Sequence, residues 1–178
     1  MTLVFSDGRV FDANLNFLKD CLHLIDVRLD EIFNTTCPDP DSFGLYDEAD
    51  HLVGWGFVAC QTYLTATLAD QGLSKREFLN RGPQHSCGRT MTELINAVAN
   101  YWKHNYEWTH DDTSARRERT LESLEALELV SQSYHLVEIL SKLVEPEPLL
   151  FRNLVPYLEE WRDEVMKASK VCSGLEPQ

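Results

Sequence analysis

Apolar residues recur at steps of three and four over long stretches of this sequence, and this periodicity restricts its fold more than any other feature. The most regular stretch comes first, with apolar residues at Leu15, Leu18, Leu22, Ile25, Leu29 and Ile32. This spacing places them all on one side of an α-helix. We predict five such helices, over residues 12–34, 46–68, 90–106, 116–144 and 149–172. One-sided helices bury their apolar sides against each other, so we expect an all-α fold, a helical bundle of four to five main helices.

The boundaries of the elements follow from local signals. Residues 3–11 contain two short β-prone runs around Asp7-Gly8, which predicts a small N-terminal β-hairpin. Asp12 is expected to cap the first helix, and a polar loop with two prolines ends it. A restart near Pro156 is expected in the last helix. We expect one helical domain over residues 1–178, with a frayed tail at 173–178.

The second predicted helix contains residues that are unusual for a helix interior. Gly54 and Gly56 each cost about 1 kcal/mol of helix propensity. We therefore expect another part of the backbone, or a ligand, to approach closely there. Gln61 lies further along the same helix, and if it is buried its amide needs hydrogen-bond partners.

The central predicted helix, residues 90–106, is the clearest single helix. Thr90 and Glu93 form a capping box at its start. Its predicted apolar face consists of Leu94, Ile95, Val98, Tyr101 and Trp102. Asn96, Asn100 and His104 fall on the opposite face at four-residue steps, so their side chains form one row. The simplest interpretation of this row is a solvated surface.

The C-terminal end of this helix resembles the motif of the HEPN family, small helical bundles that often act as ribonuclease toxins or as RNA- and nucleotide-binding modules. The family motif is an Arg, commonly followed by a polar residue, then four to six positions and a His; one branch adds a Tyr two residues later. Asn100, His104 and Tyr106 match the polar residue, the His and the Tyr. Ala99 occupies the place of the Arg.

The resemblance implies a module that acts on RNA or nucleotide, or binds it without catalysis, in a toxin or defence context. His104 would be the acid/base group, Asn100 a phosphate or backbone contact, and Tyr106 an auxiliary donor. Family members pair their motif helices across a dimer, so a homodimer is implied. Ala99 removes the cation expected to hold a scissile phosphate, so ribonuclease activity would need another cation. No cofactor is implied.

Basic residues cluster just before the central helix. Ser74 and Glu77 form a second capping box that opens a short helix, and Arg81 and Arg89 follow it. We expect an anionic ligand to contact these arginines, Lys103 and Gln61, close to Asn100 and His104. The simpler alternative is that these cations only offset an acidic surface.

The net charge of −13 is the main departure from average composition. Phosphate contacts require Lys and Arg, so this charge argues against a broad basic surface for nucleic acid but leaves room for a local basic patch. The alternative function is therefore an acidic, non-enzymatic interaction protein that binds a basic protein partner. An inhibitor that mimics nucleic acid would belong to this class.

The remaining composition sets further limits. The five cysteines are scattered and contain no CxxC pair, so we predict neither a disulfide framework nor a metal site. His85 and Cys87 followed by His104 and His110 match no recognised metal spacing. No long apolar run and no basic leader are evident, so we expect no membrane span and a cytoplasmic protein.

Overall fold

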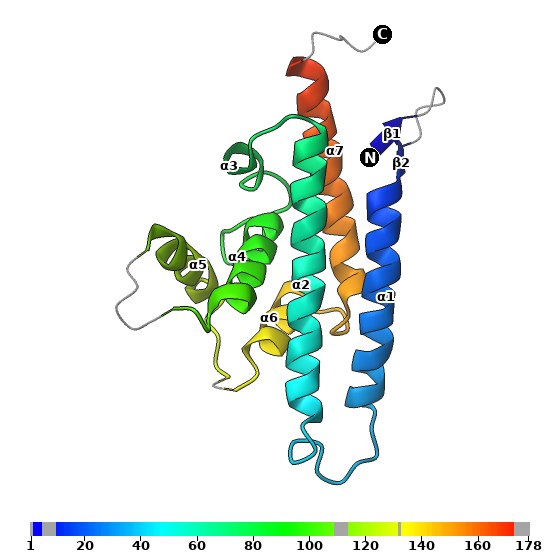
Figure 1. The fold of residues 1–178 in the computed structure, drawn as a ribbon, viewed down its shortest axis with the longest axis vertical. Coiled ribbons are helices and arrows are strands. Elements are labelled where there is room, and N and C mark those ends of the chain that lie inside the picture. The colour runs from blue at the N-terminus through cyan, green and yellow to red at the C-terminus, as the bar shows by residue number, and fades with distance from the viewer. Residues whose placement is uncertain (1, 5–9, 109–113, 132, 173–178) are drawn as a thin grey trace.

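The structure, a computed structural model, describes residues 2–4, 10–108, 114–131 and 133–172. Helices make up most of the described chain, and the longest ones run side by side (Figure 1). The sheet is a single pair of three-residue strands near the N-terminus. The predicted all-α bundle with a small N-terminal β element is confirmed.

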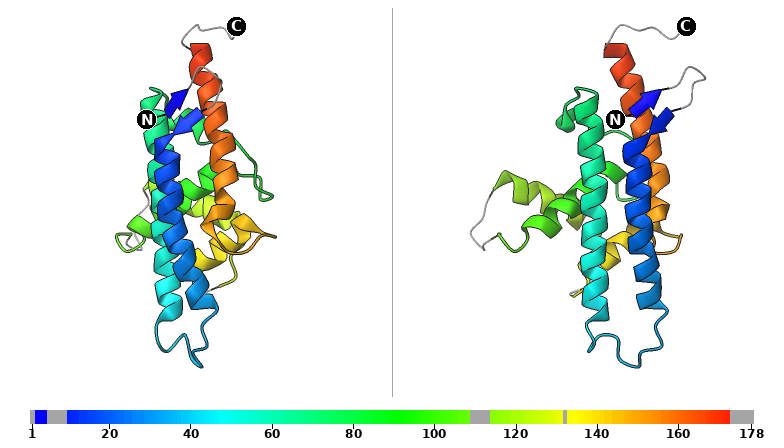
Figure 2. Two further views of the ribbon diagram at one scale, coloured as in Figure 1. Left: turned by 90° about the vertical axis from the view of Figure 1, so that its right-hand side faces the viewer. Right: turned by 45° about the vertical axis from the view of Figure 1, so that its right-hand side comes forward.

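Three long helices form the axis of the bundle. Helices α1 (Ala13–Phe33) and α2 (Leu45–Asp70) run antiparallel, and α7 (Val155–Cys172) lies alongside them (Figures 1 and 2). The first two helices start and end within two residues of the predicted boundaries. Their buried residues repeat at three- and four-residue steps, as the apolar pattern requires.

The N-terminal strands are joined to the bundle by Asp12. Strand β1 (Thr2–Val4) pairs antiparallel with β2 (Val10–Asp12). One carboxylate oxygen of Asp12 accepts a hydrogen bond from the backbone N–H of Leu15 at 2.9 Å, which is the predicted helix cap. The other accepts from the hydroxyl of Tyr63 at 2.8 Å. The predicted turn between the strands and the predicted frayed tail lie outside the described residues.

The shorter helices α4 and α5 extend from the side of α2 that faces away from α1, as two views show (Figures 1 and 2). They are preceded by the single-turn helix α3 (Lys75–Phe78). The capping box predicted at Ser74 is wrong, because its side chain makes no capping hydrogen bond. A helix of one turn is hardly longer than the nucleus that starts it, so few helical hydrogen bonds follow that a cap could stabilise.

Helix α4 (Met91–His104) is the predicted central helix. The hydroxyl of Thr90 accepts from the backbone N–H of Glu93 at 3.1 Å, so half of the predicted capping box is present. The carboxylate of Glu93 accepts instead from the guanidinium of Arg89 at 2.9 Å. An ionised donor makes the stronger hydrogen bond, which explains why the carboxylate faces the arginine.

The long fourth helix of the prediction is wrong: the structure has two helices there, α5 (Ala115–Glu125) and α6 (His135–Val144). Between them Glu128 has a left-handed backbone with φ of 50°. The carboxylate of Glu138 accepts from the N–H of Val130 and of the next residue, each at 2.7 Å. Val130, an apolar residue within the predicted helix 116–144, is 83% exposed. These bonds replace helical ones, so the chain turns.

The last helix begins with a 3₁₀ turn, η1 (Phe151–Leu154), and α7 starts one residue before Pro156, as the predicted restart requires. The buried carboxylate of Asp26 on α1 accepts from the backbone N–H groups of Phe151 at 2.6 Å and Arg152 at 3.0 Å. Burial raises the pKa of Asp26 above its usual value. This contact fixes the start of the last helix against the first.

Both glycines inside α2 are sites of close packing, but the predicted partner, another part of the backbone or a ligand, is wrong. A Cβ atom on Gly54 would overlap the indole of Trp102, and one on Gly56 would overlap the ring of Phe151. Side chains, rather than another backbone or a ligand, make the approach. Gly54 therefore sets how α2 and α4 lie against each other, which matters for the site described below.

Helix α2 is also long and apolar enough to cross a membrane by length and composition alone. In the structure it is the helix most enclosed by others, in contact with α1, α4 and α6, and 56% of its most apolar window is buried. A core helix has the same properties, so this is weak evidence for a membrane span.

Candidate functional site

A buried glutamine on α2 organises the polar contacts between α2 and α4. The side chain of Gln61 is 6% exposed. Its amide nitrogen donates to the side-chain oxygens of Asn96 at 2.8 Å and Asn100 at 2.9 Å. Its amide oxygen accepts from the ammonium group of Lys103 at 2.6 Å. Gln61, Asn100 and Lys103, all predicted site residues, are therefore brought together, and the partners expected for a buried Gln61 are present.

The geometry of α4 explains this cluster. Positions 96, 100 and 103 follow steps of four and three, which place their side chains on one face of the helix. The prediction that Asn96 and Asn100 face solvent is wrong, because this face lies against α2 and both residues are half-buried. The close contact of Trp102 with Gly54 brings the two helices near enough for a glutamine to span them.

The apolar side of α4 is also distributed differently from the prediction. Leu94, Ile95 and Val98 are fully buried as expected. Tyr101 and Trp102 are only half-buried, so they pack against the core rather than within it. The additional buried positions of α4 are held by Met91 and by the small residues Thr92, Ala97 and Ala99, because α4 lies against α2, α5 and α7 at once.

Two further cations lie near Lys103. Lys103 is an exposed residue, but partial desolvation of its ammonium group, and then the positive charge of Arg116, lower its pKa below the usual value. Burial lowers the pKa of Lys75 in the same way, with added contributions from Lys103 and Arg116. A charge that shifts the pKa of another group lies close to that group in space. We call Gln61, Lys103, Lys75 and Arg116 the basic cluster; it concentrates positive charge on a chain whose net charge is −13.

The two arginines predicted as ligand contacts do not join the basic cluster. Arg89 donates to Glu93 at 2.9 Å and to Glu122 at 2.8 Å. The hydrogen bond to Glu122 and the charge of Glu93 raise the pKa of Arg89, and its charge is compensated. The guanidinium of Arg81 lies over the ring of Phe78 at 4.6 Å. Both arginines therefore have structural partners.

Lys75 and Arg116 take the place of these arginines in the site. Lys75 belongs to the basic segment before α4. Arg116 lies at the start of α5, where a positive charge opposes the helix dipole. That unfavourable position is a sequence signal for Arg116 as a site residue, because a positive charge at a helix start usually needs another interaction to offset the dipole.

The motif residues His104 and Tyr106 lie at the end of α4. The Nδ1 atom of His104 is 2.9 Å from a carboxylate oxygen of Glu107, and the His104 side chain is 26% exposed. Tyr106 lies two residues past the end of the helix and is 87% exposed. The match to the family motif thus leads to one carboxylate-paired histidine and one exposed phenol. Ala99, which occupies the Arg position of the motif, is fully buried.

An exposed aromatic side chain lies on α2 near the basic cluster. Trp55 is 66% exposed, and its ring meets that of Trp102 edge-on at 6.2 Å between centroids. Position 55 lies about 9 Å from position 61 along the helix axis and about 120° around it. The ring of Trp55 approaches the cluster through Trp102, the residue before Lys103.

The histidines and cysteines were considered for metal binding and for thiol chemistry, and the described residues form no site for either. Among the described residues no three His, Cys, Asp or Glu side chains are grouped to hold a metal ion. His85 accepts at Nδ1 from the N–H of Cys87 and contacts the carbonyl of Lys142 through Nε2, each at 3.2 Å. His110 lies outside the described residues. Burial raises the pKa of Cys60 to about 12, so its thiol stays protonated.

No protein-family model, no curated protein and no solved structure matches the chain.

Proposed function

We propose that this protein is a HEPN-like helical module that binds RNA or a nucleotide through a phosphate at the basic cluster, without cutting it. The observation that carries the proposal is the placement of Lys103, whose ammonium group is held by the buried amide of Gln61 beside Lys75 and Arg116. A phosphate would relieve the repulsion among these three cations. The other cations considered, Arg81 and Arg89, already have partners.

The hydrogen-bonding capacity of Lys103 supports this role. An ammonium group carries three N–H donors, and Gln61 accepts one of them. Two donors remain for phosphate oxygens, and Lys103 is exposed to solvent. Lysine is a common phosphate ligand that acts as a point charge. Gln61 would serve as the positioning residue, because its other end is fixed by Asn96 and Asn100.

The positions of the motif residues support the proposal of binding without cleavage. Because Ala99 is fully buried, the chain has no cation at that position and no room for one. His104 would act as a secondary contact rather than as the acid/base group, because no cation at position 99 would hold a scissile phosphate beside it. Trp55 would stack against a base, since exposed aromatic rings beside cations are typical of single-strand binding.

The proposal includes an assembly and a location. Two copies would pair through the C-terminal end of α4, as the family resemblance implies, and the exposed ring of Tyr106 lies at that end. The protein would act in the cytoplasm, where RNA and nucleotides are present.

The test is binding of a fluorescently labelled single-stranded RNA oligonucleotide, followed by anisotropy at several salt concentrations. Lys103→Gln and Arg116→Gln should each weaken binding several-fold and reduce the slope of log affinity against log salt by about 1. Lys167→Gln, an exposed lysine on α7, is the matched control and should change neither quantity beyond a small uniform effect.

Two results would contradict the proposal. One is equal binding by the Lys103 and Lys167 variants, which would show that the cluster is not the contact. The other is the absence of binding to both RNA and nucleotides at millimolar concentration. In that case the acidic interaction protein would be the better account, and association with a basic protein should then weaken steeply as salt rises.

A further inference from the structure

The group that holds Lys103 in the basic cluster is a neutral amide. Four other described cations have a carboxylate oxygen within 2.9 Å; these are Lys19, Arg28, Arg89 and Arg162. The ammonium group of Lys103 instead contacts the amide oxygen of Gln61 at 2.6 Å. An amide oxygen accepts a hydrogen bond but carries no net charge. Gln61 therefore fixes the position of the ammonium group and leaves its positive charge uncompensated.

The charges of Lys75 and Arg116 add to that of Lys103. Partial desolvation, and then neighbouring cations, lower the pKa of both lysines, whereas a carboxylate beside either ammonium group would raise it. Arg116 lies in the first turn of α5, so the positive end of that helix dipole adds to the field of the cluster. Three positive charges are thus gathered at one place on a chain whose net charge is −13.

The positive charge of the cluster is compact rather than extended. A protein that follows the backbone of an RNA strand contacts successive phosphates, so it needs cations along the path of the strand. The arginines near the start of α4 do not provide such a path. Arg81 lies over the ring of Phe78 at 4.6 Å, and Arg89 is held by two carboxylates. The cluster therefore suits one strongly charged group better than a row of weakly charged ones.

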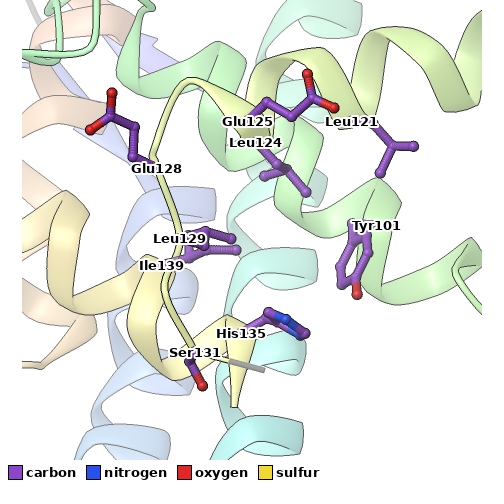
Figure 3. A pocket seen from close by; sticks show the side chains of 9 residues that line it. All are labelled: Tyr101, Leu121, Leu124, Glu125, Glu128, Leu129, Ser131, His135 and Ile139. Atoms are coloured by element: carbon purple, nitrogen blue, oxygen red, sulfur yellow. The ribbon is translucent and has the colours of Figure 1, made fainter. Parts of the chain in front are cut away.

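The cavity between α4, α5 and α6 does not offer an anion a second place to bind. Its volume is about 380 Å³, and leucine and isoleucine side chains from α5, α6 and the loop between them form much of its wall (Figure 3). The described residues that line it include Glu125 and Glu128 but no Lys or Arg. An anion in this cavity would lose hydration without gaining a cation, which is unfavourable.

The charge of a phosphate depends on its esterification. Each phosphodiester within an RNA strand carries one negative charge. A phosphate monoester, on a free nucleotide or at the end of a strand, carries about 1.5 to 2 negative charges at pH 7, because its second pKa is about 6. Of the three charges of the cluster, a diester would leave about two uncompensated and a monoester about one. The monoester therefore relieves more of the repulsion among the cations.

We infer that the basic cluster selects a terminal phosphate, a phosphate monoester with two negative charges, over the phosphodiesters within an RNA strand. This inference rests on the function proposed above and names the class of ligand for that site. Lys103, held by Gln61, donates its two remaining N–H groups to the terminal oxygens, and Lys75 and Arg116 lie beside them. A free nucleotide and the phosphorylated 5′ end of an RNA share this chemistry.

The experiment compares adenosine monophosphate with its methyl ester, each titrated into the full chain and followed by calorimetry at about pH 7.5, where the monoester is doubly charged. The methyl ester keeps the base, the sugar and the phosphorus, but its phosphate is a diester with one negative charge. Adenosine monophosphate should bind about tenfold more tightly. Tenfold corresponds to about 1.4 kcal/mol, shared among three exposed charge pairs.

A second pair of probes distinguishes the two sources of a terminal phosphate. These probes are one single-stranded RNA oligonucleotide, labelled at its 3′ end, with either a phosphate or a hydroxyl at its 5′ end. Anisotropy should show about tenfold tighter binding of the phosphorylated strand, for the reason given above. If this strand also binds more tightly than adenosine monophosphate, the natural ligand is an RNA end. Tighter binding of adenosine monophosphate would assign the site to a free nucleotide.

Substitutions connect the preference to the cluster. Lys75→Gln, Lys103→Gln and Arg116→Gln should each reduce the tenfold preference for adenosine monophosphate over its ester to about fivefold, since each removes one of three charges. Lys167→Gln, an exposed lysine on α7, is the matched control and should leave the preference unchanged. Equal melting temperatures would show that all four variants fold.

Two results would overturn the inference. The first is equal affinity for adenosine monophosphate and its ester, together with RNA binding that ignores the 5′ phosphate; the proposed RNA site would then stand without selection for a terminal phosphate. The second is an equal loss of preference in the Lys167 variant, which would assign the effect to net charge. Absence of binding by every probe is a different outcome, because it would remove the proposed function as well as the inference.

Discussion

Replacing Gly56 with alanine should destabilise the protein although alanine is the better helix former. The new Cβ would overlap the ring of Phe151, which is fully buried and meets the buried ring of Phe57 edge-on at 5.2 Å. Because Phe151 has no space to move into, overpacking should cost about 3 kcal/mol, the upper part of the usual range. Helix propensity returns about 1 kcal/mol. The net loss is therefore about 2 kcal/mol of unfolding free energy.

Gly54→Ala is the matched comparison. The ring that its Cβ would meet belongs to Trp102, which is half-buried and can shift toward solvent. Its net cost should therefore be smaller than that of Gly56→Ala. Urea denaturation followed by circular dichroism measures the unfolding free energy of both variants. In thermal unfolding the Gly56 variant should melt about 4–8 °C lower than the parent, at 2–4 °C per kcal/mol for a chain of this size. A Gly56→Ala protein as stable as the parent would refute this account of the packing.

Three further predictions concern the core and its charges. Trp161→Ala should cost about 3–5 kcal/mol in urea denaturation, because Trp161 is fully buried and its indole N–H donates to a backbone carbonyl, whereas exposed Trp55→Ala should cost almost nothing. Burial raises the pKa of Asp26, so its ionised form is less favourable in the folded than in the unfolded state. The unfolding free energy of the parent, relative to that of Asp26→Asn, should therefore rise as pH falls through the folded pKa. A difference that does not change with pH would contradict this. Ala99→Arg should lower the melting temperature strongly rather than create ribonuclease activity, because it would place a charge at a fully buried position.

Most of the fold could be predicted because helical periodicity is a local signal. The predicted first, second, central and last helices are present, and the two glycines of α2 marked real close contacts. The break between α5 and α6 could not be predicted. Apolar residues continue at helical spacing through it, and neither glycine nor proline interrupts them. The chain turns because Glu138 captures backbone N–H groups, a contact that depends on the folded loop.

The candidate site was predictable only in part. The row of Asn96 and Asn100 follows from helix geometry, and so does the need of a buried Gln61 for partners. Which groups meet depends on how α2 and α4 are aligned, and packing at Gly54 sets that alignment. Arg89 was predicted to be available, but Glu122, 33 residues later in the chain, lies next to it only in the folded protein.

The titration of the Lys75 and Lys103 side chains tests the central proposal most directly. Burial lowers both pKa values in the free protein, and so does repulsion from neighbouring cations, Arg116 for both lysines and Lys103 for Lys75. A bound phosphate would offset that repulsion, so NMR of the lysine ammonium signals should show both pKa values rising when adenosine monophosphate or a single-stranded RNA oligonucleotide is added to saturation. Unchanged pKa values in the saturated protein, or no binding of either ligand, would contradict a phosphate site at this cluster.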